Sequence, residues 1–496
     1  MENFDRVMEQ IGFGKVHLFA LLTLGLLQML TFTETMGMAG IVAPASVCDM
    51  RMTQMQMAAL TAATLMGIIC SSYFWGYITD KKGRRWTLLR TITMSTVCSI
   101  TSMFMVNFPC FFLMRFFTGV FVAGPSFVAV TYLSEFFPRA LLSRVITHMF
   151  MFTGFAMMFC PGMATLFLTS GHIDFEVHLV GNLVWRPWRM LGCVYVLPGI
   201  IALILLLFMP ESPKFLFMIG DTHKGLKVVE WISMKNTGRP LTPEQIVQLH
   251  SFQNFAQVKR QKSDQHILRA MVSDAMPLFR KPYLGNLISA CLVMFISGMI
   301  TNGLGIWYTA MRNRANMRRG DKSGMSLCQI LFVPDLGLIL EPEKDLEVIC
   351  NDDFKGFNDS FVMGALNVLM YNLCWLLLCK VPRRWIFIVS ILITSTSGCL
   401  LIFVLTSWLQ LVTCILLLGL PGVVLSLLGG ALLEDVPTYL RAKAMCICLM
   451  WARCGAVVGT ITTGMFIHHY CAQYLLLISI MPLVAACFES YLPFRF

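Results

Sequence analysis

Long apolar runs alternate with short polar segments along the whole chain. Twelve of these runs are long enough to cross a bilayer, because about 20 apolar residues in a helix span about 30 Å of hydrocarbon. They cover residues 17–43, 55–77, 87–106, 109–133, 145–169, 189–209, 284–309, 360–379, 386–405, 408–432, 442–465 and 471–491. The pattern predicts an all-α integral membrane protein with twelve transmembrane helices.

Two long polar stretches, 210–283 and 311–359, interrupt the series of apolar runs. Most of the 38 lysines and arginines lie in segments that share one side of the membrane with the N-terminus. Basic residues favour the cytosolic side. We therefore expect both termini and residues 210–283 in the cytosol, and residues 311–359 on the other side of a plasma membrane or an intracellular vesicle membrane.

The composition excludes a soluble protein. Of the 496 residues, 57% are hydrophobic and only 13% are charged, whereas a soluble domain has about 25% charged residues. The net charge of +11 does not indicate a nucleic-acid partner, because the basic residues lie between apolar runs and not in a basic module with interleaved aromatic residues. The lipid bilayer is the partner that this composition predicts.

Most of the 18 cysteines fall within apolar runs, where cysteine acts as a small hydrophobic residue. Cys328 and Cys350 differ, since they flank a polar segment of the 311–359 stretch. They are candidates for a disulfide if that segment faces an oxidising compartment.

The two halves of the chain repeat each other. Arg84-Arg85-Trp86 recurs as Arg383-Arg384-Trp385, and Glu135 and Pro138 recur as Glu434 and Pro437, all shifted by 299 residues. Repeated halves are typical of secondary transporters, which bind substrate between them. We predict two pseudo-symmetric six-helix bundles, 17–209 and 284–491, joined by the segment 210–283 and flanked by the tails 1–16 and 492–496.

The segment between the second and third apolar runs fits the pattern G-x-x-x-D-[RK]-x-G-R-[RK] and resembles the loop between helices two and three of the major facilitator superfamily. Arg115-Phe-Phe-Thr-Gly119 and the Pro210-Glu-Ser-Pro-Lys214 sequence resemble other motifs of that superfamily. The resemblance implies the major facilitator fold, with a cytosolic latch that holds the bundles together and releases them. The alternative is a basic loop that only fixes orientation.

This resemblance gives the predicted gating residues. They are Gly76, Asp80, Lys81, Gly83, Arg84, Arg85, Arg115, Glu135, Arg144, Glu434 and Arg441. In the second half, Trp375 and Cys379 replace the glycine and the aspartate of the loop, so a second latch of the same kind is not expected. For Arg115, a structural role is the alternative.

Within the superfamily, the chain is similar to the synaptic vesicle glycoprotein 2 family and to the neighbouring organic cation and anion transporters. The similarity rests on Ile11–Gly14, Tyr132–Pro138, Trp188-Arg189 and Ala452–Ala456, together with a polar loop after the seventh span. It implies a small organic substrate, or a member of the family that transports little or nothing.

Charged residues near the centre of a bilayer are costly and are therefore candidates for function. Glu34 could bind a cation or exchange a proton, or be satisfied by neighbouring threonines; Arg453 could bind an anionic group or pair with Glu34. Aromatic and amide side chains could hold an organic cation, or serve as membrane anchors and helix contacts. The predicted substrate-binding residues are Glu34, Asn302, Trp307, Tyr308, Asn367, Tyr371 and Arg453.

Signatures of enzymes, metal sites and cofactor sites are absent from the sequence. The Gly220-x-x-x-x-Gly225 segment continues with Leu226 and lacks the lysine of a phosphate-binding loop. The sequence therefore predicts a secondary active transporter of a small organic, ionic solute, with or without a coupled proton or other ion, acting as a monomer. The alternative is a non-transporting binding or trafficking protein on the same scaffold.

Overall fold

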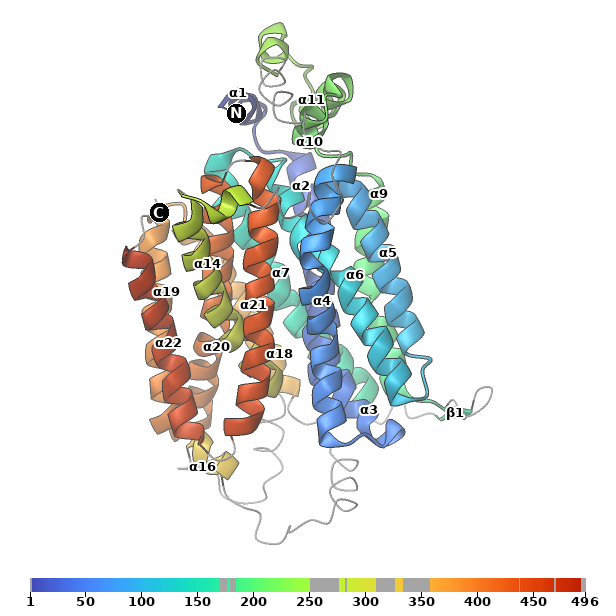
Figure 1. Ribbon diagram of the computed structural model, residues 1–496, viewed down its shortest axis with the longest axis vertical. Helices are drawn as coiled ribbons and strands as arrows, with labels where there is room; N and C mark the ends of the chain where they lie inside the picture. Colours follow the sequence, from blue (N-terminus) through green and yellow to red (C-terminus); the bar gives the residue numbers. More distant parts are fainter. Residues whose placement is uncertain are drawn as a thin grey trace.

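The computed structural model describes residues 2–169, 176–178, 184–249, 276–281, 283–308, 326–332, 357–436, 438–467 and 470–491. Most of these residues lie in long helices that run along one axis (Figure 1). The strands of the described part are β1 (Val177–His178) and β2 (Val184–Trp185), which pair in one short antiparallel hairpin. The predicted all-α membrane fold is confirmed.

Six membrane segments form the first half of the bundle. They are α2 (Lys15–Phe32) with its continuation in η1 (Thr33–Val42) and α3 (Ala43–Met50), α4 (Gln54–Lys82), α5 (Arg84–Ser102), α6 (Phe108–Ser134), α7 (Leu142–Ala164) with η3 (Thr165–Thr169), and α8 (Pro187–Val194) with α9 (Leu197–Leu207). The 3₁₀ turn η2 (Arg139–Leu141) joins α6 to α7.

Six further segments form the second half. They are α14 (Tyr283–Gly298) with η5 (Met299–Leu304), α18 (Phe357–Leu377), α19 (Arg383–Phe403), α20 (Ser407–Asp435), α21 (Thr438–Phe466) and α22 (Cys471–Tyr491). The segments η1 and η5 are wide π-helical turns inside the first helix of each half.

Ten helical stretches of the described part are long and apolar enough to cross a membrane. The other two predicted spans correspond to α5, which carries arginines at positions 84, 85 and 90, and to α22, whose apolar part is the shorter stretch Cys471–Cys487. Both pack against long helices of their own half, α5 against α6 and α9, and α22 against α14 and α19. They therefore complete the twelve membrane segments.

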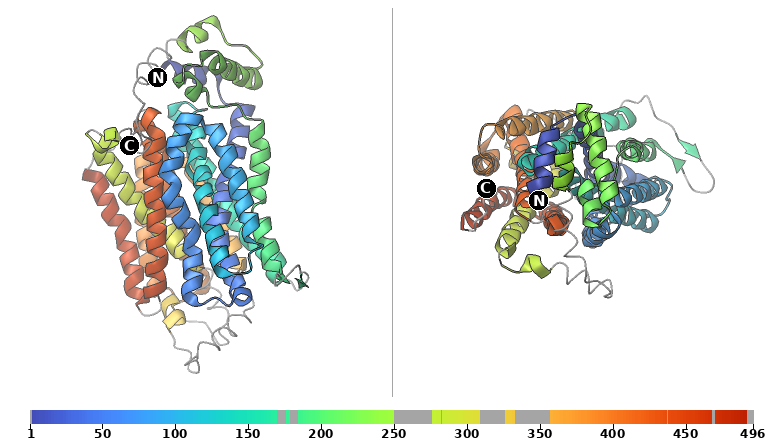
Figure 2. Two further views of the ribbon diagram at one scale, coloured as in Figure 1. Left: turned by 45° about the vertical axis from the view of Figure 1, so that its right-hand side comes forward. Right: turned by 90° about the horizontal axis from the view of Figure 1, so that it is seen from above.

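Short helices cover one end of the bundle, which we call the inner end (Figure 2). They are α1 (Glu2–Ile11), α10 (Pro213–Met218) and α11 (Thr222–Thr237), and η4 (Met276–Phe279) leads into α14. The opposite, outer end carries the β1–β2 hairpin and α16 (Leu327–Phe332) (Figure 1). Much of the predicted 311–359 loop, part of 210–283, and the tail 492–496 lie outside the described residues.

Helices of each half pack closely where glycines allow the backbones to approach. A Cβ atom added at Gly67 of α4 would lie 2.2 Å from the Phe116 carbonyl oxygen of α6, and one at Gly298 of α14 would lie 2.1 Å from the Ala452 oxygen of α21. Small residues give membrane helices this close contact. The halves meet where α7 packs on α18 and α20, and where α4 packs on α21.

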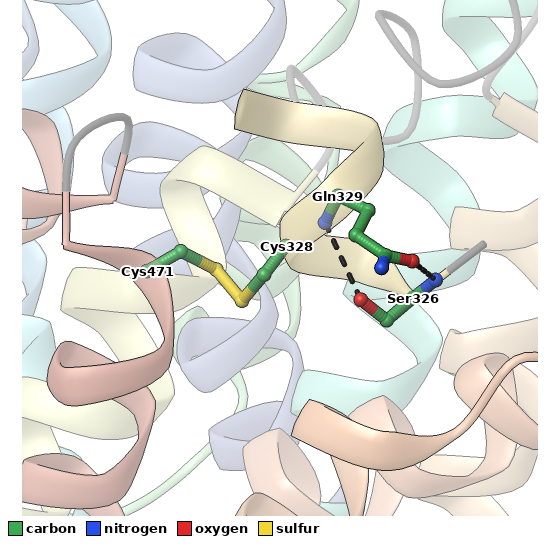
Figure 3. Close-up of a disulfide and its surroundings, with 4 residues drawn as sticks. All are labelled: Ser326, Cys328, Gln329 and Cys471. Carbon is green, nitrogen blue, oxygen red and sulfur yellow. Dashed lines mark hydrogen bonds between the residues drawn. A yellow bond between two sulfur atoms is a disulfide. The ribbon is translucent and has the colours of Figure 1, made fainter. Parts of the chain in front are cut away.

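A disulfide at the outer end differs from the predicted pair. Cys328 of α16 is bonded to Cys471 at the start of α22, with a Cα–Cα distance of 5.6 Å (Figure 3). A thiol forms only one disulfide, so the predicted Cys328–Cys350 bond is wrong; Cys350 itself lies outside the described residues. The sequence hid this partner because Cys471 begins an apolar run.

We expect peptide mapping of the unreduced protein to recover Cys328 linked to Cys471. Replacing Cys471 with serine should leave the Cys328 thiol open to alkylation in every molecule. The matched Cys350→Ser variant should keep Cys328 blocked. A Cys328 thiol that reacts in the Cys350→Ser variant and stays blocked in the Cys471→Ser variant would contradict the observed pairing.

Candidate functional site

Arg84 organises the inner end of the first half. Its side chain is only 1% exposed. Its Nε donates to Oε1 of Glu135 at 3.0 Å, one Nη to Oδ1 of Asp80 at 3.2 Å, and the other Nη to the Thr79 carbonyl oxygen at 3.3 Å. Three helix ends, those of α4, α5 and α6, are therefore tied to one guanidinium.

The predicted loop around Arg84 is a single residue. α4 continues to Lys82 and α5 begins at Arg84, so only Gly83 separates two helices. Gly83 has φ +103°, which favours glycine, and a Cβ atom there would lie 2.5 Å from Oε2 of Glu211. The glycine of the motif is thus required by both its backbone conformation and its close neighbour.

Glu211 is a member of this site that sequence reasoning did not single out. Its Oε1 accepts the backbone N–H groups of Arg84 at 2.9 Å and Arg85 at 3.0 Å. A carboxylate is favourable at a helix N-terminus, where unpaired N–H groups and the helix dipole are positive. The Pro210–Lys214 sequence therefore locks the start of α5 in place.

The second half repeats the central ion pair. Arg84 and Glu135 are 51 residues apart, and so are Arg383 and Glu434, whose side chains also form an ion pair. This second pair also contacts the first half, because Ser143 of α7 donates to Oε1 of Glu434 at 2.7 Å. The 299-residue repeat of the sequence is thus a repeat of structure.

The other predicted gating residues lie around these two pairs. A Cβ atom at Gly76 of α4 would lie 2.6 Å from the Cys446 sulfur of α21 in the other half. Arg144 of α7 donates to the Leu378 carbonyl oxygen at 3.3 Å, also across the halves. Arg441 is buried and donates to the Val436 oxygen at 2.9 Å. The halves therefore touch through several of the predicted residues.

Lys81 and Arg85 face outward from this cluster. Lys81 is exposed, and its Nζ lies 5.5 Å from the centre of the Tyr77 ring. Arg85 is half-buried and donates to the last carbonyl groups of α9, at Leu207, at 2.8 Å. A cation at a helix C-terminus is favourable, so Arg85 fixes α9 beside α5.

The N-terminal helix α1 is held against the inner end by Asp5. One carboxylate oxygen accepts a hydrogen bond from Nζ of Lys214, and the other forms an ion pair with Nε of Arg139, both at 3.3 Å. Burial lowers the pKa of Lys214 to about 8, and the Asp5 carboxylate opposes that shift. Phe4, Val7 and Met8 of α1 are fully buried on the same face. Figure 2 shows α1 and its neighbours lying across this end.

A central cavity lies between the two halves. It leaves ≈ 80 Å³ for the centres of water molecules, and about 10–15 Å³ of such space holds one water. Four predicted binding residues line it, namely Asn302, Asn367, Tyr371 and Arg453. Further polar residues that the sequence analysis missed also line it: Gln28, Thr31, Thr35, Ser72, Ser126, Thr153 and Thr301.

Some of these polar cavity residues could have been predicted from their spacing in the sequence. Gln28, Thr31 and Thr35 stand three and four residues apart within an apolar run, which puts them on one face of the first helix. A polar face on a membrane helix points away from lipid. The same spacing separates Asn367 from Tyr371 in α18.

Arg453 is the one charged residue among those that line the cavity. Its side chain is half-buried, and no described residue gives it a hydrogen bond or an ion pair. No described carboxylate reaches the cavity wall. An unpaired cation in a membrane interior is costly, so the cavity is electropositive and suited to an anion.

Glu34 has a different partner from the predicted one. Its Oε2 accepts from Arg115 of α6 at 2.6 Å, and its Oε1 accepts from Ser99 of α5 at 2.7 Å. The Glu34 and Arg115 side chains are 1% and 3% exposed. Of the two alternatives for Arg453, pairing with Glu34 is therefore wrong, and Arg115 lies within the first half and not at the inner end.

Two more predicted binding residues lie away from the central cavity. Trp307 donates through Nε1 to the Thr460 carbonyl oxygen at 2.9 Å, which is a contact between helices. Tyr308 is buried and lines a second cavity nearer the outer end. Glu34 lines neither cavity. Among the described residues, no cluster of His, Cys, Asp or Glu could hold a metal ion.

Solved structures of transporters share this fold. The major facilitator proton:xylose symporter XylE bound to 6-bromo-6-deoxy-D-glucose superposes with a TM-score of 0.69 and 15% identity over 97% of each chain. The partially occluded inward-open xylose transporter XylE of E. coli gives 0.66 and 14% over 96% of this chain and 98% of its own.

Sequence comparison finds curated relatives. Synaptic vesicle glycoprotein 2C of Rattus norvegicus is 23% identical over 328 residues, which are 62% of this chain and 44% of that protein. Synaptic vesicle glycoprotein 2B of Homo sapiens is 20% identical over 323 residues, 62% of this chain and 47% of its own. The match thus spans less than half of these relatives.

A sequence model of the family described as sugar (and other) transporter matches residues 25–312, more than half of the chain. This match includes the Arg84 site, the Glu34–Arg115 pair and the π-helical turns of both halves. The chain therefore belongs to the sugar (and other) transporter family and has the major facilitator fold, with sequence similarity to synaptic vesicle glycoprotein 2.

Proposed function

We propose that the protein is a secondary transporter that carries a small organic anion across its membrane by alternating access. The observation that supports the anion is the unpaired Arg453 guanidinium in the central cavity. A bound carboxylate, sulfonate or phosphate would give this cation the charge-assisted hydrogen bonds that the protein does not supply. A neutral sugar or an organic cation would leave it uncompensated.

The arrangement around the cavity supports alternating access. Residues of both halves line the cavity, and the Arg84 and Arg383 ion pairs lie at the helix ends of the inner side. Rocking of one half against the other around a fixed central site is the mode of transport expected of repeated bundles. We place both termini in the cytosol, together with the inner end, where α1 packs against α10 and α11.

The binding test uses a matched set of ligands on the purified protein. A ligand that binds only the folded form raises the unfolding temperature. We expect organic anions to raise it, and their neutral amide or ester analogues to leave it unchanged. Arg453→Gln should weaken anion binding by about 10-fold or more, because hydrogen bonds to charged groups contribute about 1.5–3 kcal/mol. Arg453→Lys should keep part of the affinity.

The opposite pattern would overturn the proposal. A neutral sugar or a cation that stabilises the wild type and the Arg453→Gln variant equally would exclude Arg453 as the ligand-binding charge. Uptake of the stabilising anion into proteoliposomes then tests transport. Binding without uptake or counterflow would favour the second candidate, a binding or trafficking protein, which the Trp375 and Cys379 replacements in the second half also favour.

A further inference from the structure

A second cavity lies between the central one and the outer end of the bundle. It also leaves ≈ 80 Å³ for the centres of water molecules. None of its described lining residues is charged. Most are apolar, and Met36, Ile41, Pro161, Ile306, Met363 and Leu418 belong to this cavity alone. Its chemistry therefore differs from that of the central cavity with its arginine and amides.

Four residues line both cavities and form a neck between them: Phe32, Met157, Thr301 and Asn367. Phe32 is the last residue before the π-helical turn η1, and Thr301 lies within the π-helical turn η5. π-helical turns inside helices are frequent at functional sites. The neck thus stands where the first helix of each half changes its winding.

The neck carries two buried oxygen atoms that no hydrogen bond satisfies, Oγ1 of Thr301 and Oδ1 of Asn367. The Asn367 side chain is 5% exposed, and its Nδ2 contacts the Met157 sulfur at 3.4 Å. Buried polar groups normally have partners, and an unsatisfied group is a candidate for binding a ligand or an unseen water. The Asn367 oxygen would accept a hydrogen bond from a ligand N–H, and the Thr301 hydroxyl could donate one to a ligand carbonyl oxygen at the neck.

We infer that the two cavities and the neck form one site for an amphipathic anion with a hydrogen-bonding group between its charged head and an apolar tail. The head binds Arg453, the linking group binds Thr301 and Asn367, and the tail fills the outer cavity. This inference rests on the proposed function and narrows its substrate class. N-acyl amino acids have this arrangement of carboxylate, amide and tail.

The test measures binding of N-acylglycines with acetyl, hexanoyl and decanoyl tails, beside alkanoates of matched length that lack the amide. Each CH₂ group that enters the outer cavity should tighten binding about fourfold, the equivalent of about 0.8 kcal/mol, until the cavity is full. At equal tail length the N-acylglycine should bind more tightly than the alkanoate. In Asn367→Leu this difference should shrink.

Two glycines allow the outer cavity to be filled without displacing its walls. A Cβ atom at Gly305 would have no atom within 4 Å, and one at Gly40 would lie 3.9 Å from the Ile306 oxygen. Gly305→Leu should remove the gain from tail length, so that the decanoyl compound binds no more tightly than the acetyl one. Gly162→Leu is the matched control, since Gly162 lines neither cavity and has only Phe361 at 3.9 Å.

The possible outcomes separate this inference from the proposed function. Arg453-dependent binding that is independent of tail length would overturn the amphipathic site and leave the anion transporter standing. Equal weakening of the acetyl and decanoyl compounds by Gly305→Leu would show that the outer cavity is only an access path and does not bind the tail. This result would also overturn the amphipathic site and leave the anion transporter standing. Binding of none of these anions would overturn both, and the pattern predicted above supports both.

Discussion

Arg115→Leu is expected to destabilise the protein by about 3–5 kcal/mol, because the substitution leaves the buried Glu34 carboxylate without its cation. The pair lies inside the membrane region, where neither side chain reaches water. The Arg115 guanidinium also donates to the Ser99 hydroxyl at 3.2 Å and to the Glu34 backbone oxygen at 3.1 Å. Equilibrium unfolding of the purified protein in mixed micelles measures the loss.

Arg453→Gln is the control for this experiment. Arg453 is also an arginine within a membrane helix, but it has no partner among the described residues. Its removal should therefore leave the free energy of unfolding unchanged or raise it, although it should weaken anion binding by about 10-fold or more. Arg115 would thus be needed for stability, and Arg453 for anion binding.

The double variant Glu34→Leu/Arg115→Leu should recover most of the stability that either single variant loses. Replacing both members of a buried ion pair with apolar residues is often neutral or stabilising. The coupling energy from the double-mutant cycle should therefore be large and favourable. Additive losses, or a cost below 1 kcal/mol for Arg115→Leu alone, would show that the observed contact contributes little.

The helices could be predicted from the sequence because a membrane imposes a length and a polarity on each one. The predicted spans agree with the observed helices to within a few residues at most ends. The exceptions have local causes. α4 continues through the basic residues to Lys82, since charged side chains can lie on a helix beyond the apolar region, and only Gly83 interrupts it.

The partners of individual side chains could not be predicted in the same way. Glu34 and Arg453 both lie in membrane helices, and the sequence alone does not show which helix faces meet. In the structure, Glu34 forms an ion pair with Arg115, and Arg453 lines the central cavity. Cys471 was likewise indistinguishable from the cysteines of the apolar core. Such pairings depend on the rotation of each helix about its axis, which periodicity constrains only loosely.

The repeated Arg-Arg-Trp sequence corresponds to a structural arrangement that both halves share. In both copies the first arginine forms an ion pair with a glutamate 51 residues later. In both, the tryptophan, Trp86 or Trp385, is exposed on the surface of the bundle, where aromatic residues anchor helices at the membrane interface. The ion pair of the first copy is more deeply buried than that of the second, so we expect the two pairs to differ in their contribution to stability.

Arg84→Gln is expected to cost about 3–5 kcal/mol of stability, whereas Arg383→Gln should cost about 1 kcal/mol or less. The Arg84 side chain is 1% exposed and its loss takes the cation away from the buried Glu135 carboxylate, which is the costly case of a broken buried pair. Arg383 and Glu434 are 17% and 22% exposed, so water compensates part of the loss. Unfolding in mixed micelles measures both.

Arg383→Gln should instead loosen the contact between the halves, because the Arg383 guanidinium also donates to Ser143 of the other half at 3.3 Å. Cys446, buried against Gly76 where α4 meets α21, is a native reporter of that contact. We expect its alkylation to be faster in Arg383→Gln than in the wild type. Cys414, buried within the second half, should stay protected. Equal acceleration at both cysteines would indicate unfolding, and no acceleration at Cys446 would show that Arg383 does not hold the two halves together.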